Sequence, residues 1–295
     1  MSHFVEAIGF GVVTASIVAL GAVGFTLQLG VTNMFNLAYG SSMTVSAFVA
    51  YLVHTAAPLN IWASMVAAAA AGALLAILLQ MLFYGPFIRR GSTIFALVMV
   101  SLALGLVLQF SIEAIAGTGF FSYNLPPSAS LEFGGFVLTT RQLAIIAIAI
   151  LAMAGVHILL KLTRLGKAMR ATAADAELAR AAGINTNRVI LTTWAISGLL
   201  SGLAGVVLAM NTVVFGASTT GNFLLLIVAA AVVGGIGQAY GAMLGALCIG
   251  LVTEISAIWI PELKDVAAFA ILAGVLLVYP GGILGGSRRD LAGAL

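Results

Sequence analysis

The sequence predicts an all-α, polytopic integral membrane protein with about nine transmembrane helices. Of its 295 residues, 62% are hydrophobic and only 7% are charged, and the mean hydropathy is +1.19. A soluble domain carries about 25% charged residues. The apolar residues form long runs near the roughly 20 residues that a spanning helix needs, whereas a β-barrel would show short alternating strands. The 34 glycines also suit closely packed membrane helices.

The apolar segments predict nine spans, with eight as the alternative. The segment that ends near Gly237 is short enough for a half-helix. The second segment is interrupted by the polar stretch TNMFNLAYGSS, so a broken helix is the alternative there. No loop is long enough for a second domain, and residues 1–295 are predicted to form a single transmembrane domain. The segments are 8–29, 33–53, 61–84, 93–115, 142–160, 189–211, 222–236, 239–258 and 266–284.

Basic residues predict the orientation, because cytoplasmic loops carry an excess of Lys and Arg. The residues predicted to be cytoplasmic are Arg89, Arg90, the six basic residues of the stretch 161–188, Arg288 and Arg289. This assignment leaves only Arg141 and Lys264 of the 12 basic residues outside. The N-terminus is then outside and the C-terminus inside. The longest outer loop, 116–141, contains Pro126 and Pro127 and is predicted to be irregular or to hold a short hairpin.

The side chains that covalent or ion-coupled chemistry requires are scarce in the predicted spans. The histidines His3, His54 and His157 fall at the N-terminus or near span ends, and Glu113 and Glu254 lie near outer helix ends. No HExxH motif is present, and no predicted span holds a pair of carboxylates. These features argue against an intramembrane enzyme, and against a channel or an ion-coupled carrier, whose pathway would carry ionisable groups. They also predict no metal site.

The sequence also lacks a site for ATP of its own. The phosphate-binding motif GxxxxGK[ST] is absent, so nucleotide hydrolysis would need a partner at the cytoplasmic face. The lone Cys248 excludes an internal disulfide. The net charge of +3 is interpreted as loop bias, not as a surface for nucleic acid.

One charged, Ala-rich stretch stands out in this apolar chain. Residues 161–188 hold six of the 12 basic and two of the 9 acidic residues. Thr172 and Asp175 match a capping box, the segment 173–182 favours helix, and Gly183 supplies a left-handed stop. Such a short helix is marginal alone, and Leu178 is its only large apolar residue. It either docks in a groove of another protein or is a solvated connector whose charges enforce topology.

This stretch continues into ILTTWAISGLLSGLAGVV, and two further stretches read GVTNMFNLAYGSSMTVSAFVAYL and AAAVVGGIGQAYGAMLGALCIGLV. In their order along the chain, the three resemble the permeases of branched-chain amino acid ABC importers. The likeness covers nearly the whole chain. One departure is Tyr39, where a His is expected after Asn-Leu/Phe-Ala, and this departure leaves the identity of the ligand open.

The resemblance implies a multi-pass subunit of the bacterial inner membrane that works with a second, related permease. Two ATPase subunits would bind ATP and Mg beneath it, and an extracytoplasmic solute-binding protein would deliver ligand; this chain itself would bind no cofactor. The segment 173–182 would be the coupling helix that docks on an ATPase. The substrate stays open between branched-chain amino acids, other amino acids, amides, urea and organic acids, as does a homodimeric or heterodimeric permease core. The predicted docking residues are Thr172, Asp175, Glu177, Leu178, Arg180, Ala182 and Gly183.

A polar patch in the first part of the chain is the second candidate site. Buried amides and hydroxyls without partners cost a few kcal/mol, so these groups must bond to each other, to water or to substrate. They either join helices or line the pathway. The patch consists of Gln28, Thr32, Asn33, Asn36, Tyr39, Ser41 and Ser42.

Small residues at four-residue spacing predict close helix packing. A moving interface is the alternative. They are Gly198 with Gly202, Ser197 with Ser201 and Gly205, and Gly237 with Gly241 and Gly245.

Overall fold

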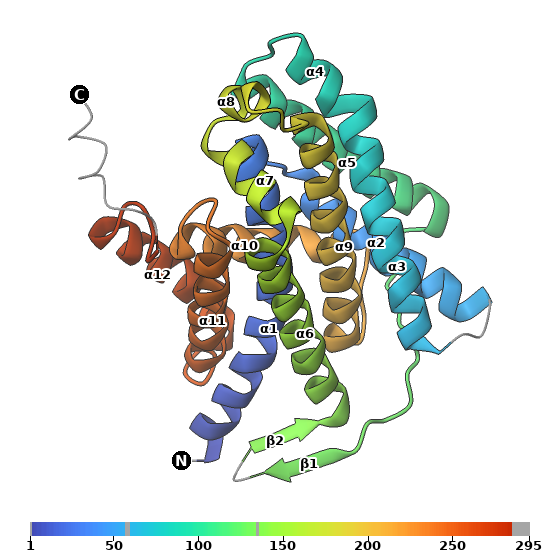
Figure 1. Cartoon of the computed structure of the whole chain (residues 1–295). Coiled ribbons are helices and arrows are strands. Elements are labelled where there is room, and N and C mark those ends of the chain that lie inside the picture. Colours follow the sequence, from blue (N-terminus) through green and yellow to red (C-terminus); the bar gives the residue numbers. More distant parts are fainter. Residues whose placement is uncertain (1, 57–59, 134–135, 285–295) are drawn as a thin grey trace. The chain divides into compact units, whose positions relative to one another are not determined.

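The computed structural model describes residues 2–56, 60–133 and 136–284, which form helices and one short hairpin (Figure 1). Strands β1 (Ser130–Phe133) and β2 (Phe136–Thr139) pair antiparallel, which confirms a hairpin in the predicted outer loop. The helices are α1 (Ser2–Thr32), α2 (Ala38–Ala56), α3 (Ile61–Leu79), the π-helical turn η1 (Gln80–Tyr84), α4 (Gly85–Arg89), α5 (Ile94–Ala116), α6 (Thr140–Leu162), α7 (Arg164–Ala174), α8 (Ala176–Ala181), α9 (Thr186–Thr212), α10 (Thr219–Gly234), α11 (Ala239–Ser256), the 3-10 turn η2 (Pro261–Leu263) and α12 (Lys264–Val278).

In the described part of the chain, six helical segments are long and apolar enough to cross a membrane. The predicted count of nine spans is therefore not confirmed. The other apolar helices are α2, which is rich in Ser and Thr, and α10 and α12, which have 16 and 15 residues. At 1.5 Å per residue, these last two reach only about 22–24 Å of the roughly 30 Å hydrocarbon core. The six segments are Phe4–Thr32, Ile61–Arg89, Ile94–Ala116, Thr140–Leu162, Thr186–Thr212 and Ala239–Ser256.

The second predicted segment is not broken inside, because α2 runs without interruption and only the first residues of the segment form a link between helices. Helix α1 ends at Thr32, Asn33 has a left-handed φ of 51°, and α2 begins at Ala38. The polar stretch thus separates two helices, although its last residues belong to α2. Helix α12 ends two residues before Pro280, because the residue that precedes a proline is disfavoured in the helical conformation.

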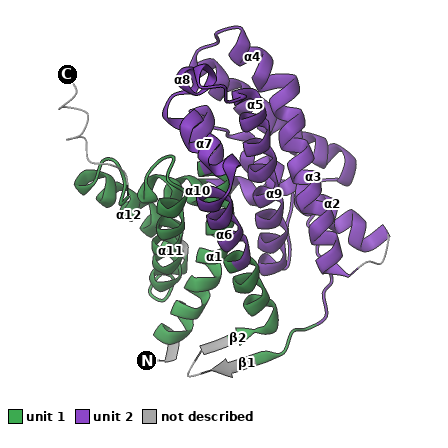
Figure 2. Cartoon of the chain, viewed as in Figure 1, with its two compact units in different colours: residues 1–26, 127–150, 225–295 green, residues 27–126, 151–224 purple. Residues whose placement is uncertain are grey.

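The chain divides into two compact units, shown in green and purple in Figure 2. Unit 1 comprises Met1–Thr26, Pro127–Ile150 and Leu225–Leu295, and unit 2 comprises Leu27–Pro126 and Leu151–Leu224. The boundaries fall inside α1, α6 and α10, so three helices continue from one unit into the other. The single transmembrane domain remains a prediction.

Glycines bring the helices of unit 2 into backbone contact. Helix α9 packs along α3 and α2. A Cβ atom on Gly198 would collide with the carbonyl oxygen of Gly72, and one on Gly202 would lie 2.8 Å from the carbonyl oxygen of Ala68. Neither position can hold a larger residue unless the helices separate. The close packing predicted for Gly198 and Gly202 is confirmed.

In unit 1, the predicted glycine ladder is only partly correct. Gly241 of α11 packs on the carbonyl of Gly234, and Gly245 packs on that of Ala230, both in α10. Gly237 was predicted to extend this ladder, and that prediction is wrong. It precedes α11, and its φ of +80° places it in a left-handed turn. Its value to the fold is conformational freedom, because side chains other than glycine rarely adopt this φ.

Candidate functional site

The two ends of unit 2 differ in charge. The basic segments α4, α7 and α8 lie at one end, in the upper part of Figure 1. At the far end of α9, Phe215 and Phe121 exchange backbone hydrogen bonds of 2.8 and 2.9 Å, which join the residues that follow α9 to the predicted outer loop 116–141. The basic residues of unit 2 therefore gather away from the segments that were predicted to be outside. Arg288 and Arg289 lie outside the described residues.

Helix α7 is held firmly to the end of α6. The Thr163 side chain accepts a hydrogen bond from Gly166 N at 3.0 Å and donates one to the Leu159 carbonyl at 2.6 Å. Gly166 sits so close to the Leu159 and Leu160 carbonyls that a Cβ atom would overlap them. The Arg170 guanidinium donates to the Leu160 carbonyl, one of the last of α6 and without a partner inside that helix. The start of α7 is therefore fixed to the last turn of α6 by hydrogen bonds and close packing.

The start predicted for the helix over 173–182 is wrong. Residues up to Ala174 belong to α7, and Asp175 is extended, with φ −156° and ψ 109°. Asp175 itself caps α8, since its Oδ1 accepts hydrogen bonds from Glu177 N at 2.8 Å and Leu178 N at 2.9 Å. Thr172 is buried in α7 and caps nothing, because it lies before the break. Instead of one helix that begins with a capping box, the chain forms two short helices separated by the extended residue Asp175.

The predicted end of this helix is confirmed. Gly183 has a φ of +84°, and its N–H donates to the Arg180 carbonyl at 3.0 Å. The N–H of Ile184 donates to the Ala179 carbonyl, also at 3.0 Å, which completes a Schellman motif. Helix α8 therefore has 6 residues, with a cap at each end.

Helix α8 turns its small side toward the rest of unit 2. Ala179 is buried, whereas Leu178 is 68% exposed. Glu177, Arg180 and Ala182 are exposed as well. The exposed side of α8 is therefore one large apolar side chain with charges of both signs around it.

The polar patch forms a buried cluster where α1 ends and α2 begins. Asn36 Oδ1 accepts hydrogen bonds from the Tyr84 hydroxyl at 2.9 Å and from Ala38 N at 3.1 Å. Gln28 Oε1 accepts from Ser197 Oγ at 3.1 Å and from Asn36 Nδ2 at 3.4 Å. The cluster therefore connects the first two helices to η1 and α9.

The members of the predicted patch have different surroundings. Tyr39 joins the cluster through a hydrogen bond with Ser197. Ser42 is buried but bonds its own helix at the Ala38 carbonyl, 2.9 Å away. Ser41 is half-buried, and Asn33 is exposed. Thr32, half-buried, bonds its own helix through the Gln28 carbonyl.

Three buried polar groups near this cluster have no hydrogen-bond partner among the described residues. They are Gln28 Nε2, Trp194 Nε1 and Ser201 Oγ. Trp194 stacks on Tyr84, with ring centroids 4.9 Å apart. Sequence reasoning missed Tyr84 and Trp194, because an aromatic residue in an apolar run gives no sign of a polar partner. An internal water or a polar solute would satisfy such groups.

Two carboxylates of the spans each accept a hydrogen bond from a side chain of their own unit. Glu254 accepts a hydrogen bond from Thr14 at 2.7 Å, and Glu113 accepts one from Gln109 at 3.2 Å. Among the described residues, no three His, Cys, Asp or Glu side chains are grouped as metal ligands would be. These two carboxylates therefore take part in hydrogen bonds between helices and within a helix.

The family model described as "Branched-chain amino acid transport system / permease component" matches residues 7–278 of the chain. The high-affinity branched-chain amino acid transport system permease protein LivH of Salmonella typhimurium is 31% identical over 299 residues, with 96% of each chain covered. The corresponding protein BraD of Pseudomonas aeruginosa is 30% identical over 300 residues, again with 96% of each covered.

Among solved structures, a chain of PsaBC from Streptococcus pneumoniae in complex with Fab has a similar fold, with a TM-score of 0.50 at 16% sequence identity. The similarity covers 97% of this chain and 94% of that chain. At this identity the likeness concerns the fold alone. The match of the family model over nearly the full length shows that the chain belongs to the family of branched-chain amino acid transport system permease components.

Proposed function

We propose that this chain is the membrane-spanning permease subunit of an ATP-driven ABC importer for branched-chain or related amino acids. The observation that carries the proposal is the family match over residues 7–278. LivH and BraD, which are similar over 96% of their length, are permease proteins of high-affinity branched-chain amino acid transport systems. The six apolar segments supply the multi-pass architecture that the role requires.

In this proposal the chain does no covalent chemistry and is not itself an enzyme. ATP and Mg bind to two ATPase subunits at the cytoplasmic face, and a second permease subunit completes the pathway. An extracytoplasmic solute-binding protein delivers the substrate. ATP hydrolysis drives the two permease subunits between an outward-open and an inward-open conformation. Substrate binding alone changes the populations of these conformations only as far as the substrate binds one of them more tightly.

Helix α8 is the proposed contact with the ATPase. Its support is the exposed Leu178 beside Glu177 and Arg180, on a helix capped at both ends. The anchoring of α7 to the last turn of α6 gives this contact a route into a span. A solvated connector would not need an exposed leucine at its centre.

The buried polar cluster is proposed to support the pathway. Its hydrogen bonds fix the link between α1 and α2. In this role Asn36, Gln28 and Ser197 join helices to one another. Gln28 Nε2 and Ser201 Oγ are the groups left for water or solute when the pathway opens. The substrate is expected to be a small zwitterion, because the described spans carry so few charges to neutralise a net ion.

Reconstitution tests the proposal. Vesicles that hold this chain, the partner permease and both ATPases, with the binding protein added outside, are expected to accumulate radiolabelled leucine only when ATP is supplied to the ATPase side. Vesicles that lack this chain are the control. Leucine uptake by this chain alone, driven by a proton or sodium gradient, would favour the ion-coupled carrier instead.

A further inference from the structure

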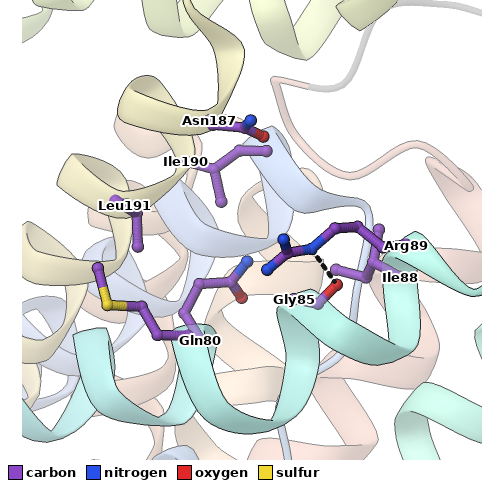
Figure 3. A pocket seen from close by; sticks show the side chains of 8 residues that line it. Gln80, Gly85, Ile88, Arg89, Asn187, Ile190 and Leu191 are labelled. Carbon is purple, nitrogen blue, oxygen red and sulfur yellow. Dashed lines mark hydrogen bonds between the residues drawn. The ribbon is translucent and has the colours of Figure 1, made fainter.

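A groove with a volume of about 260 Å³ lies within unit 2, between the end of the third predicted span and the first turns of α9 (Figure 3). Its polar lining is Gln80, Arg89 and Asn187, and its apolar lining includes Ile88, Ile190 and Leu191. The groove lies at the basic end of unit 2, and its lining includes neither a polar residue of the buried cluster nor a residue of α8. The proposed transport function does not use it.

The polar groups of the groove have unused hydrogen-bonding capacity. Arg89 commits its Nε to the Gly85 carbonyl at 3.3 Å and turns its guanidinium toward the Gln80 amide (Figure 3). Gln80 is only 7% exposed, and its Oε1 has no hydrogen-bond partner among the described residues. A half-turn of the amide exchanges its oxygen and nitrogen, so this position can either accept or donate a hydrogen bond.

The π-helical turn η1 creates this arrangement. The N–H of Gly85 bonds the carbonyl of Gln80, five residues back, so the turn is wider than an α-helical one. A Cβ atom on Gly85 would lie 2.8 Å from that carbonyl. Turns of this kind occur often at functional sites.

The charge around the groove favours an anion. Arg90 follows Arg89, Arg188 follows Asn187, and all four side chains are exposed. The described acidic residues at this end of unit 2 are Asp175 and Glu177, and Asp175 is engaged as the cap of α8. A guanidinium with free N–H groups binds phosphate oxygens in pairs.

The expected position of the groove across the membrane, at the level of the lipid headgroups, points to a lipid. The span Ile61–Arg89 has 29 residues, which is about 43 Å of helix, compared with roughly 30 Å of hydrocarbon and 40–45 Å including headgroups. Arg89, its last residue, therefore lies at headgroup depth. Met81 and Leu82 on the same span are 49% and 64% exposed, and they provide apolar surface for an acyl chain below the headgroup.

We propose that this groove binds the phosphate of an anionic phospholipid, with Arg89 as the main contact, Gln80 and Asn187 as hydrogen-bonding partners, and an acyl chain along Met81 and Leu82. Basic pockets between spanning helices recognise acidic headgroups in this way. Binding to the cytoplasmic leaflet in particular follows from the proposed orientation. The binding itself depends on neither the orientation nor the transported substrate.

Native mass spectrometry of the full-length chain tests the proposal. The protein is exposed in detergent to an equimolar mixture of phosphatidylglycerol and phosphatidylcholine with identical acyl chains. Phosphatidylglycerol is expected to be retained preferentially, and Arg89→Gln is expected to reduce its retention about tenfold, because hydrogen bonds to charged groups are strong. Arg89→Lys, which keeps the charge but loses the fork, is expected to be intermediate.

Arg180→Gln is the matched control for lipid retention. Arg180 is also exposed and also donates its Nε to the carbonyl four residues back, at 3.4 Å, but it does not line the groove. Retention in this variant is expected to equal that of wild type, and both Gln variants should elute as wild type in size-exclusion chromatography. Equal retention of the two lipids, or loss of phosphatidylglycerol in Arg180→Gln as large as in Arg89→Gln, overturns the proposal. Displacement of phosphatidylglycerol by millimolar inorganic phosphate also overturns it, because it identifies a site for free phosphate.

Discussion

The Tyr84 hydroxyl donates a 2.9 Å hydrogen bond to Asn36 Oδ1 across 48 positions of sequence. This bond joins the turn η1, at the end of the third predicted span, to the break between α1 and α2. The same oxygen of Asn36 also accepts from Ala38 N, so one side chain both caps α2 and binds a tyrosine. The start of α2 and the π-helical turn therefore depend on a single amide.

We expect Asn36→Leu to destabilise the protein much more than Tyr84→Phe. The tyrosine variant loses one hydrogen bond, at about 1 kcal/mol. The asparagine variant loses the cap and also leaves the Tyr84 hydroxyl buried without a partner, at about 2–4 kcal/mol in total. Unfolding in mixed micelles, followed by circular dichroism against the mole fraction of SDS, measures both free energies.

The double variant distinguishes this explanation from two unrelated effects. The buried Tyr84 hydroxyl destabilises the protein only when Asn36 is absent. In the Asn36→Leu background, Tyr84→Phe is therefore expected to recover part of the lost free energy of unfolding. Strictly additive losses would mean that the two residues act independently.

Backbone contact between α3 and α9 predicts a large effect from a single methyl group. A Cβ atom on Gly198 collides with the Gly72 carbonyl, so Gly198→Ala is expected to cost about 1–3 kcal/mol as the helices separate. Gly155→Ala is the matched control, because Gly155 also lies inside a helix but no atom outside its own helix backbone lies within 4 Å of its added Cβ. That substitution is expected to be neutral or to stabilise by up to about 1 kcal/mol. Equal melting temperatures for the two alanine variants would contradict the packing argument.

Periodic and compositional features of this chain could be interpreted without a structure, and features that depend on a distant partner could not. Gly198 and Gly202 were identified from four-residue spacing within one helix. The same spacing failed at Gly237, because the helix begins only after it and its backbone is left-handed. Spacing alone does not show where a helix starts.

The candidate sites show the same division. Gln28, Asn36 and Tyr39 stood out because they are polar residues in an apolar run. Tyr84 did not, since its partner lies 48 positions away. In the charged stretch, Gly183 was predicted correctly from local sequence. The capping box failed because Asp175 competes with Thr172 as a cap, and its extended backbone ends α7 before α8 begins.

The basic end of unit 2 lies away from the end that holds the Phe121–Phe215 pair, and this separation predicts that two cysteines are exposed on opposite sides of the membrane. In a Cys248→Ala background, Thr118→Cys should react with a membrane-impermeant maleimide from the periplasmic side, and Ala174→Cys only from the cytoplasmic side. Both positions are exposed, and both belong to unit 2. Labelling of intact spheroplasts and of inverted vesicles gives the two readouts. Reaction of both cysteines from the same side would refute the predicted orientation.

Leu178 provides the sharpest test of the proposed contact with an ATPase. It is 68% exposed in this chain, and burying a leucine fully in a groove contributes roughly 1.5–3 kcal/mol. Leu178→Asp removes that contribution and places a carboxylate where it would lose its hydration. Because the side chain points away from unit 2, the variant is expected to insert and fold as wild type but to lose most of its ATPase in co-purification and most of its ATP-driven uptake.

Glu177→Gln is the control for that experiment. Glu177 is an exposed neighbour on the same helix, and exposed ion pairs contribute only about 0–1 kcal/mol. Its loss is therefore expected to leave ATPase attachment nearly unchanged. Measuring ATPase co-purification beside vesicle uptake separates loss of docking from loss of coupling, since an uncoupled variant retains its ATPases while uptake falls. If Leu178→Asp keeps both its ATPases and its uptake, α8 is a solvated connector, and the force that drives transport must enter the permease elsewhere.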